Sequence, residues 1–277
     1  MALNDPGGLG GGLAVDDLRR SGIHAAIAAD QDTVPPAIRG TCAAAGVRVI
    51  TAQEFRELRE GRVDIDALAA DWLATAAVTR GTRIAAVFRR AFDIIGSIAL
   101  LVLTLPVLLL TAIAIRLESP GPVFYRQERV GQHGRVFRLF KFRSMSVDAE
   151  KGGPRWAAPR DPRVTRVGRL IRLARIDEIP QALNVLRGDM ALIGPRPERP
   201  NFVEHLAAVI PHYASRNAVR PGITGWAQIN YPYGASVEDA RNKLAYDLYY
   251  LRHRSVALDV AIVFGTIRVI LLQEGAR

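Results

Sequence analysis

Cysteine is almost absent from this sequence of 277 residues. Cys42 is the only one, so the chain can form no internal disulfide, and a metal site built from several cysteine thiolates is excluded. A single cysteine is compatible with a reducing compartment. The sequence also lacks a GxxxxGKS or GxxxxGKT stretch, which excludes a phosphotransferase of the P-loop type.

Acidic residues are scarce relative to basic ones. The chain has 37 Lys and Arg against 27 Asp and Glu, a net charge of +10 at pH 7. Such an excess suits anionic lipid headgroups, phosphate-bearing substrates and nucleic acid alike. The sequence shows no zinc-finger spacing and no clear helix-turn-helix. Net charge is therefore the only feature that would favour a nucleic-acid partner. We therefore expect lipid headgroups or phosphate substrates as partners, and no nucleic acid.

There is one long hydrophobic run, residues 91–117, with Pro106 near its middle. Basic residues flank both ends, which under the positive-inside rule favours both ends on the same face of a membrane. Each half has about 13 residues, roughly 20 Å of helix, too short to cross a ~30 Å hydrocarbon core. We predict a re-entrant helix-break-helix hairpin that enters one leaflet and returns. Thr104 could bond a backbone carbonyl one turn earlier and so repair the break.

Two other interpretations of this run stay open. Proline is tolerated in membrane helices, so residues 91–117 could form a kinked helix that spans the bilayer. A buried core helix of a soluble protein fits less well, because apolar residues surround the whole circumference.

The predicted fold is mixed α/β and mostly helical, in two domains. Residues 1–80 would hold a flexible Gly-rich tail (residues 1–13) and a truncated Rossmann-like accessory fragment, and residues 81–277 a membrane-associated domain. The fragment reads as βαβα, with strands at 24–29 and 47–50 and helices at 35–45 and 53–60. It has no glycine fingerprint, so we expect no nucleotide there and a structural or regulatory role.

Two further segments suit a membrane surface. Residues 164–174 alternate apolar and arginine positions at helical spacing, which predicts a basic amphipathic helix; headgroup contact is favoured over a merely solvated face. Residues 258–272 are apolar but interrupted by Asp259 and Arg268. That segment is more consistent with an interfacial helix than with a span.

Asp177 and Glu178 are the candidate catalytic residues. They begin a predicted helix, DEIPQALNVLRGD, where an isolated Asp-Glu pair most often only caps the helix and favours its dipole. Cations in rigid or basic stretches favour chemistry instead: Lys141 in KFRSM, Arg196 in ALIGPRP and Arg220 in RPGITGWAQIN. Acidic residues surrounded by fixed cations suit a divalent metal and a diphosphate.

Several motifs in order carry a resemblance to a known family: RQERVGQHGRVFRLFKFRSM, RIDEIPQALNVLRGDMALIGPRP, RPGITGWAQIN and YDLYYLRHRS. Together they resemble the bacterial monotopic phosphoglycosyl transferases, or bacterial sugar transferases. These polyprenyl-phosphate sugar-1-phosphate transferases start polysaccharide and glycoconjugate assembly. The likeness covers Arg89 to Leu272. The N-terminal fragment is similar to the end of the Rossmann-like accessory domain of larger members.

The resemblance implies a ping-pong reaction at the cytoplasmic face of the bacterial inner membrane, by a monotopic protein. Asp177, with Glu178 as its partner, would attack the sugar-bearing phosphorus of a nucleoside-diphosphate sugar, a UDP-sugar by resemblance, and carry a covalent phosphosugar. Polyprenyl (undecaprenyl) phosphate would then accept the phosphosugar. Mg²⁺, held at least partly by Asp177, would neutralise the diphosphate.

The resemblance also implies roles in substrate binding. Arg196 matches an arginine that orients a phosphate or carboxylate, and Lys141, Arg220 and Asp247 are weaker matches. Arg196 could instead cap a turn, Lys141 could bind lipid headgroups, and Asp247 could pair with Lys243 one turn earlier.

A catalytically silent membrane scaffold of a polysaccharide assembly complex is the alternative function. The sequence identifies neither the sugar nor the pathway (exopolysaccharide, capsule or O-antigen). It leaves the oligomeric state open, a homo-oligomer included.

Overall fold

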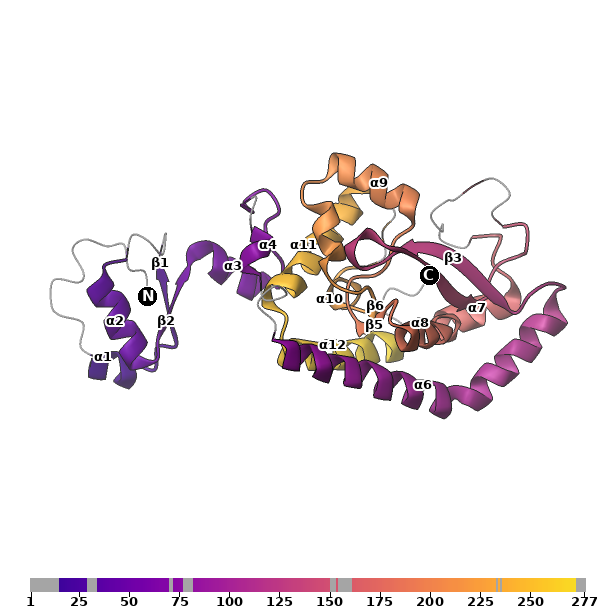
Figure 1. Ribbon diagram of the computed structural model, residues 1–277, viewed down its shortest axis with the longest axis horizontal. Coiled ribbons are helices and arrows are strands. Elements are labelled where there is room, and N and C mark those ends of the chain that lie inside the picture. The colour runs from indigo at the N-terminus through magenta and orange to yellow at the C-terminus, as the bar shows by residue number, and fades with distance from the viewer. Residues whose placement is uncertain are drawn as a thin grey trace. The chain divides into compact units, whose positions relative to one another are not determined.

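The structure is a computed structural model (Figure 1). It describes residues 15–28, 34–69, 72–76, 82–149, 153, 161–232, 234 and 236–272. The Gly-rich tail predicted at residues 1–13 lies outside these ranges. Contacts along the chain group it into two compact units, Met1–Arg62 and Val63–Arg277.

The first unit has the predicted βαβα order, with its two strands paired in parallel. Gly46, with φ 77°, ends the first helix of this pattern, and the Thr51 hydroxyl caps the second by accepting a hydrogen bond from the Glu54 amide. A likeness to a Rossmann domain stays a prediction. The elements are α1 (Val15–Arg20), β1 (Ala25–Ala28), α2 (Pro36–Ala45), β2 (Arg48–Thr51) and α3 (Ala52–Glu60).

The apolar run forms one long helix, α6 (Arg83–Glu118), in place of two helices separated by a break. It begins earlier than the expected residue 91, because the Thr82 hydroxyl caps it by accepting a hydrogen bond from the Ala85 amide and the arginines that follow are good helix formers. By length and composition α6 could cross a membrane. The predicted re-entrant path stays a prediction.

Pro106 lies inside α6 and removes one backbone donor. Figure 1 shows the helix changing direction along its second half, as expected for an internal proline. The Thr104 hydroxyl donates a 2.6 Å hydrogen bond to the Leu100 carbonyl, which confirms the predicted bond one turn earlier.

Polar contacts bind the first half of α6 to the rest of the second unit. The Arg90 guanidinium donates to the Val185 and Leu186 carbonyls at 2.6 and 2.8 Å. The Asp93 carboxylate, 6% exposed, accepts a hydrogen bond from the Leu192 amide at 2.9 Å. This half therefore has a fixed place on the unit.

The far end of α6 is bound to the same unit. Ile115 packs with Phe142 and Ile171 in a small buried cluster. The guanidinium of Arg143 donates to the carbonyls of Ile115 and Ser119 at 3.2 and 2.8 Å, satisfying carbonyls that a helix end leaves unpaired.

The described part of this unit also contains two small sheets. β3 (Phe124–Val130) and β4 (Val136–Phe142) form an antiparallel hairpin, with Tyr125 directly opposite Lys141. β5 (Ala191–Ile193) and β6 (Gly222–Thr224) pair in parallel. In the hairpin, alternate residues share one face, so the register places Tyr125 and Lys141 on the same side.

The main core of the unit surrounds α11 (Val237–His253), whose Leu244, Leu248 and Leu251 are fully buried. This core also includes Val63, Ile65, Leu68, Trp72 and Ala76. The other elements are α4 (Trp72–Thr75), η1 (Gln132–Gly134), α7 (Arg166–Leu173), η2 (Ile176–Gln181), α8 (Ala182–Arg187), α9 (Pro200–Val209), η3 (Tyr213–Ala218), α10 (Trp226–Asn230) and α12 (Val256–Leu271).

The helix predicted to start at Asp177 begins differently. Arg175 has a left-handed backbone (φ 53°), and residues Ile176–Gln181 form a 3₁₀ helix before α8 starts. Pro180 lies in this segment and lacks an amide donor. The alternative in which Asp177 only caps a helix is therefore not supported, since its side chain makes no cap hydrogen bond to η2 or α8.

Candidate functional site

A cavity of about 730 Å³ is lined by residues of β3, β4, α7, η2 and α9 to α12. Eleven of its lining residues are lysine or arginine and four are aspartate or glutamate. The four acids are Asp177, Glu178, Glu198 and Asp247. A concave site with an excess of cations suits a polyanionic ligand such as a diphosphate.

Glu178 is held mainly by Lys141 and Arg196, with Arg175 more distant at 3.9 Å. Its carboxylate accepts a hydrogen bond from Lys141 Nζ at 3.0 Å and is paired with the guanidinium of Arg196. Burial alone would raise the pKa of Glu178, but Arg196 and Lys141 together hold it well below its ordinary value. In turn, burial lowers the pKa of Lys141, against the opposing charge of Glu178. Glu178 is therefore a fixed anion with no capacity left for proton transfer near neutral pH.

Asp177 differs from its neighbour. It is 7% exposed and lines the cavity, yet among the described residues no side chain or amide donates a hydrogen bond to its carboxylate. Burial raises the pKa of Asp177 to about 6; Lys141 opposes this shift and the nearby charge of Glu178 adds to it. A desolvated carboxylate without hydrogen bonds is a stronger nucleophile than a solvated one.

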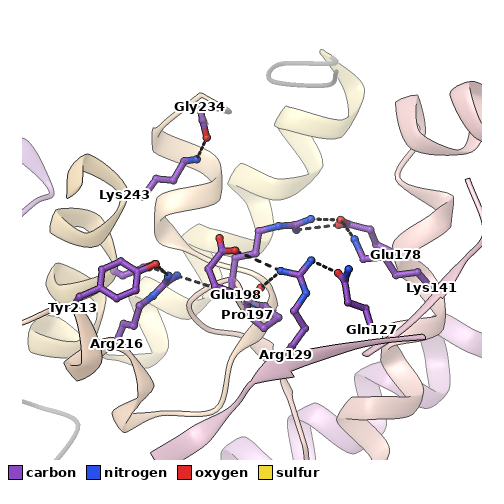
Figure 2. A network of polar contacts seen from close by, with 12 residues as sticks. Gln127, Arg129, Lys141, Glu178, Pro197, Glu198, Tyr213, Arg216, Gly234 and Lys243 are labelled. Carbon is purple, nitrogen blue, oxygen red and sulfur yellow. Dashed lines mark hydrogen bonds and ion pairs between the residues drawn. The ribbon is translucent and has the colours of Figure 1, made fainter. Parts of the chain in front are cut away.

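Arg196 lies in the turn between β5 and α9, and its guanidinium contacts Glu178. Figure 2 shows Glu178 with Lys141 at one side of the polar network and Arg216 with Tyr213 at the other. The charge of Glu178 raises the pKa of Arg196 above its usual range, so the guanidinium stays protonated. The structure therefore brings together Asp177, Glu178, Arg196 and Lys141, as predicted from their motifs.

Asp247 lies at the opposite end of this network. Its carboxylate accepts a 2.7 Å hydrogen bond from Arg216, so the alternative pairing with Lys243 is wrong; Lys243 donates to the Gly234 carbonyl at 2.7 Å. Burial raises the pKa of Asp247 to about 6, against the opposing charge of Arg216. The Arg216 guanidinium also donates to the Tyr213 hydroxyl at 2.7 Å (Figure 2).

Arg220 does not line the cavity. It is half-buried and lies close enough to Asp93 of α6 to interact electrostatically with that carboxylate. The motif that contains Arg220 contributes Ala227 to Asn230 to the cavity wall instead.

Of the cationic residues that line the cavity, sequence reasoning named only Lys141 and Arg196 as site residues. Those that it missed include Arg129, Arg172 and Arg216. Arg129 faces the cavity because residues 125, 127 and 129 alternate on β3, a period of two that is visible in the sequence. Arg172 lies on α7, and its guanidinium makes no hydrogen bond or ion pair among the described residues. Its charge opposes the rise in the pKa of Asp177.

The donor set allows a test of the predicted Mg²⁺ site. Among the described residues no three His, Cys, Asp or Glu side chains cluster as metal ligands. Glu178, Glu198 and Asp247 are each paired with at least one cation, so that among the described residues lining the cavity Asp177 is the carboxylate without an ion pair. Mg²⁺ commonly uses one or two carboxylates together with substrate phosphates and water, so Asp177 fits such an ion once a phosphate ligand is bound.

Comparisons with known proteins agree with this chemistry. A family model described as Bacterial sugar transferase matches residues 84–273. The chain is 47% identical over 236 residues to an Aeromonas hydrophila protein named UDP-N-acetylgalactosamine-undecaprenyl-phosphate N-acetylgalactosaminephosphotransferase, covering 85% of this chain and 55% of that protein. The chain thus spans about half the length of that relative.

Two other relatives are named UDP-glucose:undecaprenyl-phosphate glucose-1-phosphate transferase. The one from Escherichia coli is 43% identical over 181 residues, covering 65% of this chain and 39% of that protein. The one from Caulobacter vibrioides is 43% identical over 190 residues, covering 68% of this chain and 71% of that protein.

Proposed function

Because the chain belongs to the bacterial sugar transferase family, we propose that it transfers a sugar-1-phosphate from a UDP-sugar to undecaprenyl phosphate and so starts the assembly of a polysaccharide or glycoconjugate. The observation that carries this proposal is the contrast between two adjacent carboxylates. Glu178 is bound by Lys141 and Arg196, while Asp177 faces a cation-rich cavity without a hydrogen-bond donor.

In the first step an Asp177 carboxylate oxygen attacks the sugar-bearing phosphorus of the donor. A bond forms between that oxygen and phosphorus, and the bond from phosphorus to the bridging oxygen breaks, so that UMP leaves with the electron pair. In the second step the phosphate oxygen of undecaprenyl phosphate attacks the same phosphorus. The acyl phosphate bond breaks, Asp177 is regenerated as a carboxylate, and the product is an undecaprenyl diphosphate sugar.

The cations of the site make this attack feasible, because a carboxylate and a diphosphate repel each other unless positive charge lies between them. Arg172 is the first candidate, since it lines the cavity and acts on Asp177 without a partner of its own among the described residues. Lys141 and Arg196 keep Glu178 ionised and lie within the same cluster.

Asp177 would hold Mg²⁺ in this scheme. When bound, the ion would supply Lewis-acid neutralisation of the diphosphate and of the departing phosphate.

We place the protein on the cytoplasmic face of the bacterial inner membrane, as a monotopic protein. Between its two anchored ends α6 exposes a continuous apolar stretch, in which Leu103 is 80% exposed. Because Asp93 before Pro106 and Ile115 after it both contact the same compact unit, a helix path that returns to its own face fits better than a crossing. Exposed apolar residues of α7 and α12, such as Leu170 and Phe264, would contact the same lipid surface with anionic headgroups.

Trapping the covalent intermediate tests the proposed function. Purified protein would be incubated with UDP-N-acetylgalactosamine or UDP-glucose carrying ³²P in the β-phosphate, the donors in the names of the relatives. We expect protein-bound label and release of UMP, both lost in Asp177→Asn and retained in Asp66→Asn, an exposed carboxylate on the same unit. Membrane binding without label in the wild-type protein for any UDP-sugar would favour a catalytically silent scaffold.

A further inference from the structure

The turn that carries Arg196 is held from outside at four consecutive carbonyls. Each accepts one hydrogen bond of 2.9 Å: Pro195 from the Gly222 amide, Arg196 from the Arg216 guanidinium, Pro197 from the Arg129 guanidinium, and Glu198 from the Val130 amide. Two of these donors are backbone groups of neighbouring strands, and two are arginine side chains. A turn with so many external bonds cannot shift without breaking several at once.

The Arg216 side chain is bound mainly by other groups of the protein. It is 8% exposed and donates to Tyr213, to the Arg196 carbonyl and to Asp247, whose own side chain is 3% exposed. A guanidinium with these three partners keeps little donor capacity for a substrate phosphate. The buried Asp247 carboxylate is likewise occupied.

We propose that Arg216 and Asp247 are positioning residues, which fix the backbone of the Arg196 turn and thereby the guanidinium that binds Glu178. This inference rests on the proposed function, and it gives Asp247 a role that does not require contact with substrate. Asp247 neutralises and orients Arg216, Arg216 fixes the Arg196 carbonyl, and Arg196 keeps Glu178 in place beside Asp177. A displacement of about 1 Å in such a chain is enough to misplace a reacting group.

Hydrogen exchange tests the structural half of this proposal without any substrate. Arg216→Gln and Asp247→Asn should raise the exchange rates of the Val130 and Gly222 amides, because both amides donate to this turn. Arg241→Gln is the matched control, since Arg241 lies on α11 with Asp247 but pairs with the exposed Asp66. Exchange rates at both amides that equal those of the wild-type protein would overturn the proposal.

A double-mutant cycle tests the functional half with UMP release from whichever UDP-sugar the wild-type protein uses. We expect Arg196→Ala to lower turnover about 10²-fold and Arg216→Gln about 10-fold. The double variant should be no slower than Arg196→Ala alone, because Arg216 acts through Arg196. Losses that multiply would overturn the proposal.

Misfolding of Arg216→Gln would make its lower turnover uninformative, so two replacement variants are defined. If Arg216→Gln loses its cooperative thermal unfolding transition, Arg216→Lys, which keeps the charge, and Asp247→Asn, which keeps the side-chain size, replace it in the cycle with the same expectations. A wild-type protein that releases UMP from no donor would contradict the proposed function alone, and the exchange rates would still decide the positioning role.

Discussion

Asp177 and Glu178 are neighbours in the chain but have opposite acid–base properties. Burial acts on both, and the difference comes from geometry: Glu178 has Lys141 and Arg196 within bonding distance, and Asp177 has neither. A low pKa fixes Glu178 as an anion, and a pKa of about 6 makes Asp177 sensitive to pH in the physiological range. The pair therefore combines a permanent counter-charge with a titratable nucleophile.

The rate of formation of the labelled intermediate should depend on pH through Asp177. Its carboxylate must be ionised to attack, and its pKa is raised to about 6. The rate should therefore be low at pH 5, rise about tenfold per pH unit below the pKa, and level off above pH 7. Single-turnover labelling between pH 5 and 8 measures this profile, and a rate independent of pH across that range would contradict it.

The same profile should move when a neighbouring cation is removed. Arg172 opposes the rise in the pKa of Asp177, so in Arg172→Gln the acidic limb should shift to higher pH. Arg135→Gln is the control, because Arg135 lies in the β3–β4 turn and not on the cavity wall. An acidic limb that stays in place in Arg172→Gln would show that Arg172 lies too far from Asp177 to influence it.

At the scale of elements, α6 is the helix that we propose lies in the membrane, and it is bound at both ends to the unit that holds the site. Its first half is fixed by Arg90 and Asp93, and its end is fixed by Arg143, which directly follows β4. The exposed apolar stretch between these contacts includes Leu103 and Leu110. The geometry of α6 should thus depend on both the protein and the lipid.

Asp93→Ala should weaken the attachment of α6. The substitution leaves the Leu192 amide without its acceptor, and an unsatisfied donor in a part-buried place costs about 1–3 kcal/mol of unfolding free energy. Asp66→Ala is the control, because an exposed ion pair contributes about 0–1 kcal/mol. Denaturant unfolding in mixed micelles measures the difference, and equal effects of the two substitutions would mean that the Asp93 contact is not stabilising.

Cysteine labelling tests the path of α6. In a Cys42→Ser background, cysteines at two exposed positions, Arg83→Cys at the first residue of α6 and Glu128→Cys beyond its end, should react with a membrane-impermeant maleimide from the same side of sealed vesicles. Pro106→Ala should straighten the helix, so that the two labelled positions lie on opposite sides of the membrane. Labelling from opposite sides in the protein with Pro106 intact would establish a spanning helix.

At the scale of the whole molecule, the family could be predicted from sequence because its motifs are contiguous. Asp177, Glu178 and Arg196 lie in one stretch of the chain, and the structure keeps them together. The family model match confirms that prediction. The βαβα order of the first unit also followed from local signals, such as Gly46 at a helix end.

Pairings between distant residues could not be predicted in the same way. Asp247 pairs with Arg216, 31 residues away, although Lys243 lies one turn earlier on the same helix. Arg220 lies in a motif that reaches the cavity, but Arg220 itself does not line the cavity and instead interacts electrostatically with Asp93 of α6. Spacing along the chain fixes which residues are neighbours on a helix, and only the tertiary fold fixes which of several nearby partners is used.

Lys141 lies on β4, and Arg143 directly follows the last residue of that strand. Lys141 binds Glu178, and Arg143 binds the carbonyls at the end of α6. A change in bilayer thickness or detergent that alters the tilt of α6 should therefore displace the end of β4. The same strand holds Lys141, which pairs with Glu178 beside Asp177. We therefore expect that a preparation in unsuitable lipid or detergent stays folded and soluble while its turnover declines, because the surroundings of α6 influence the geometry of the site.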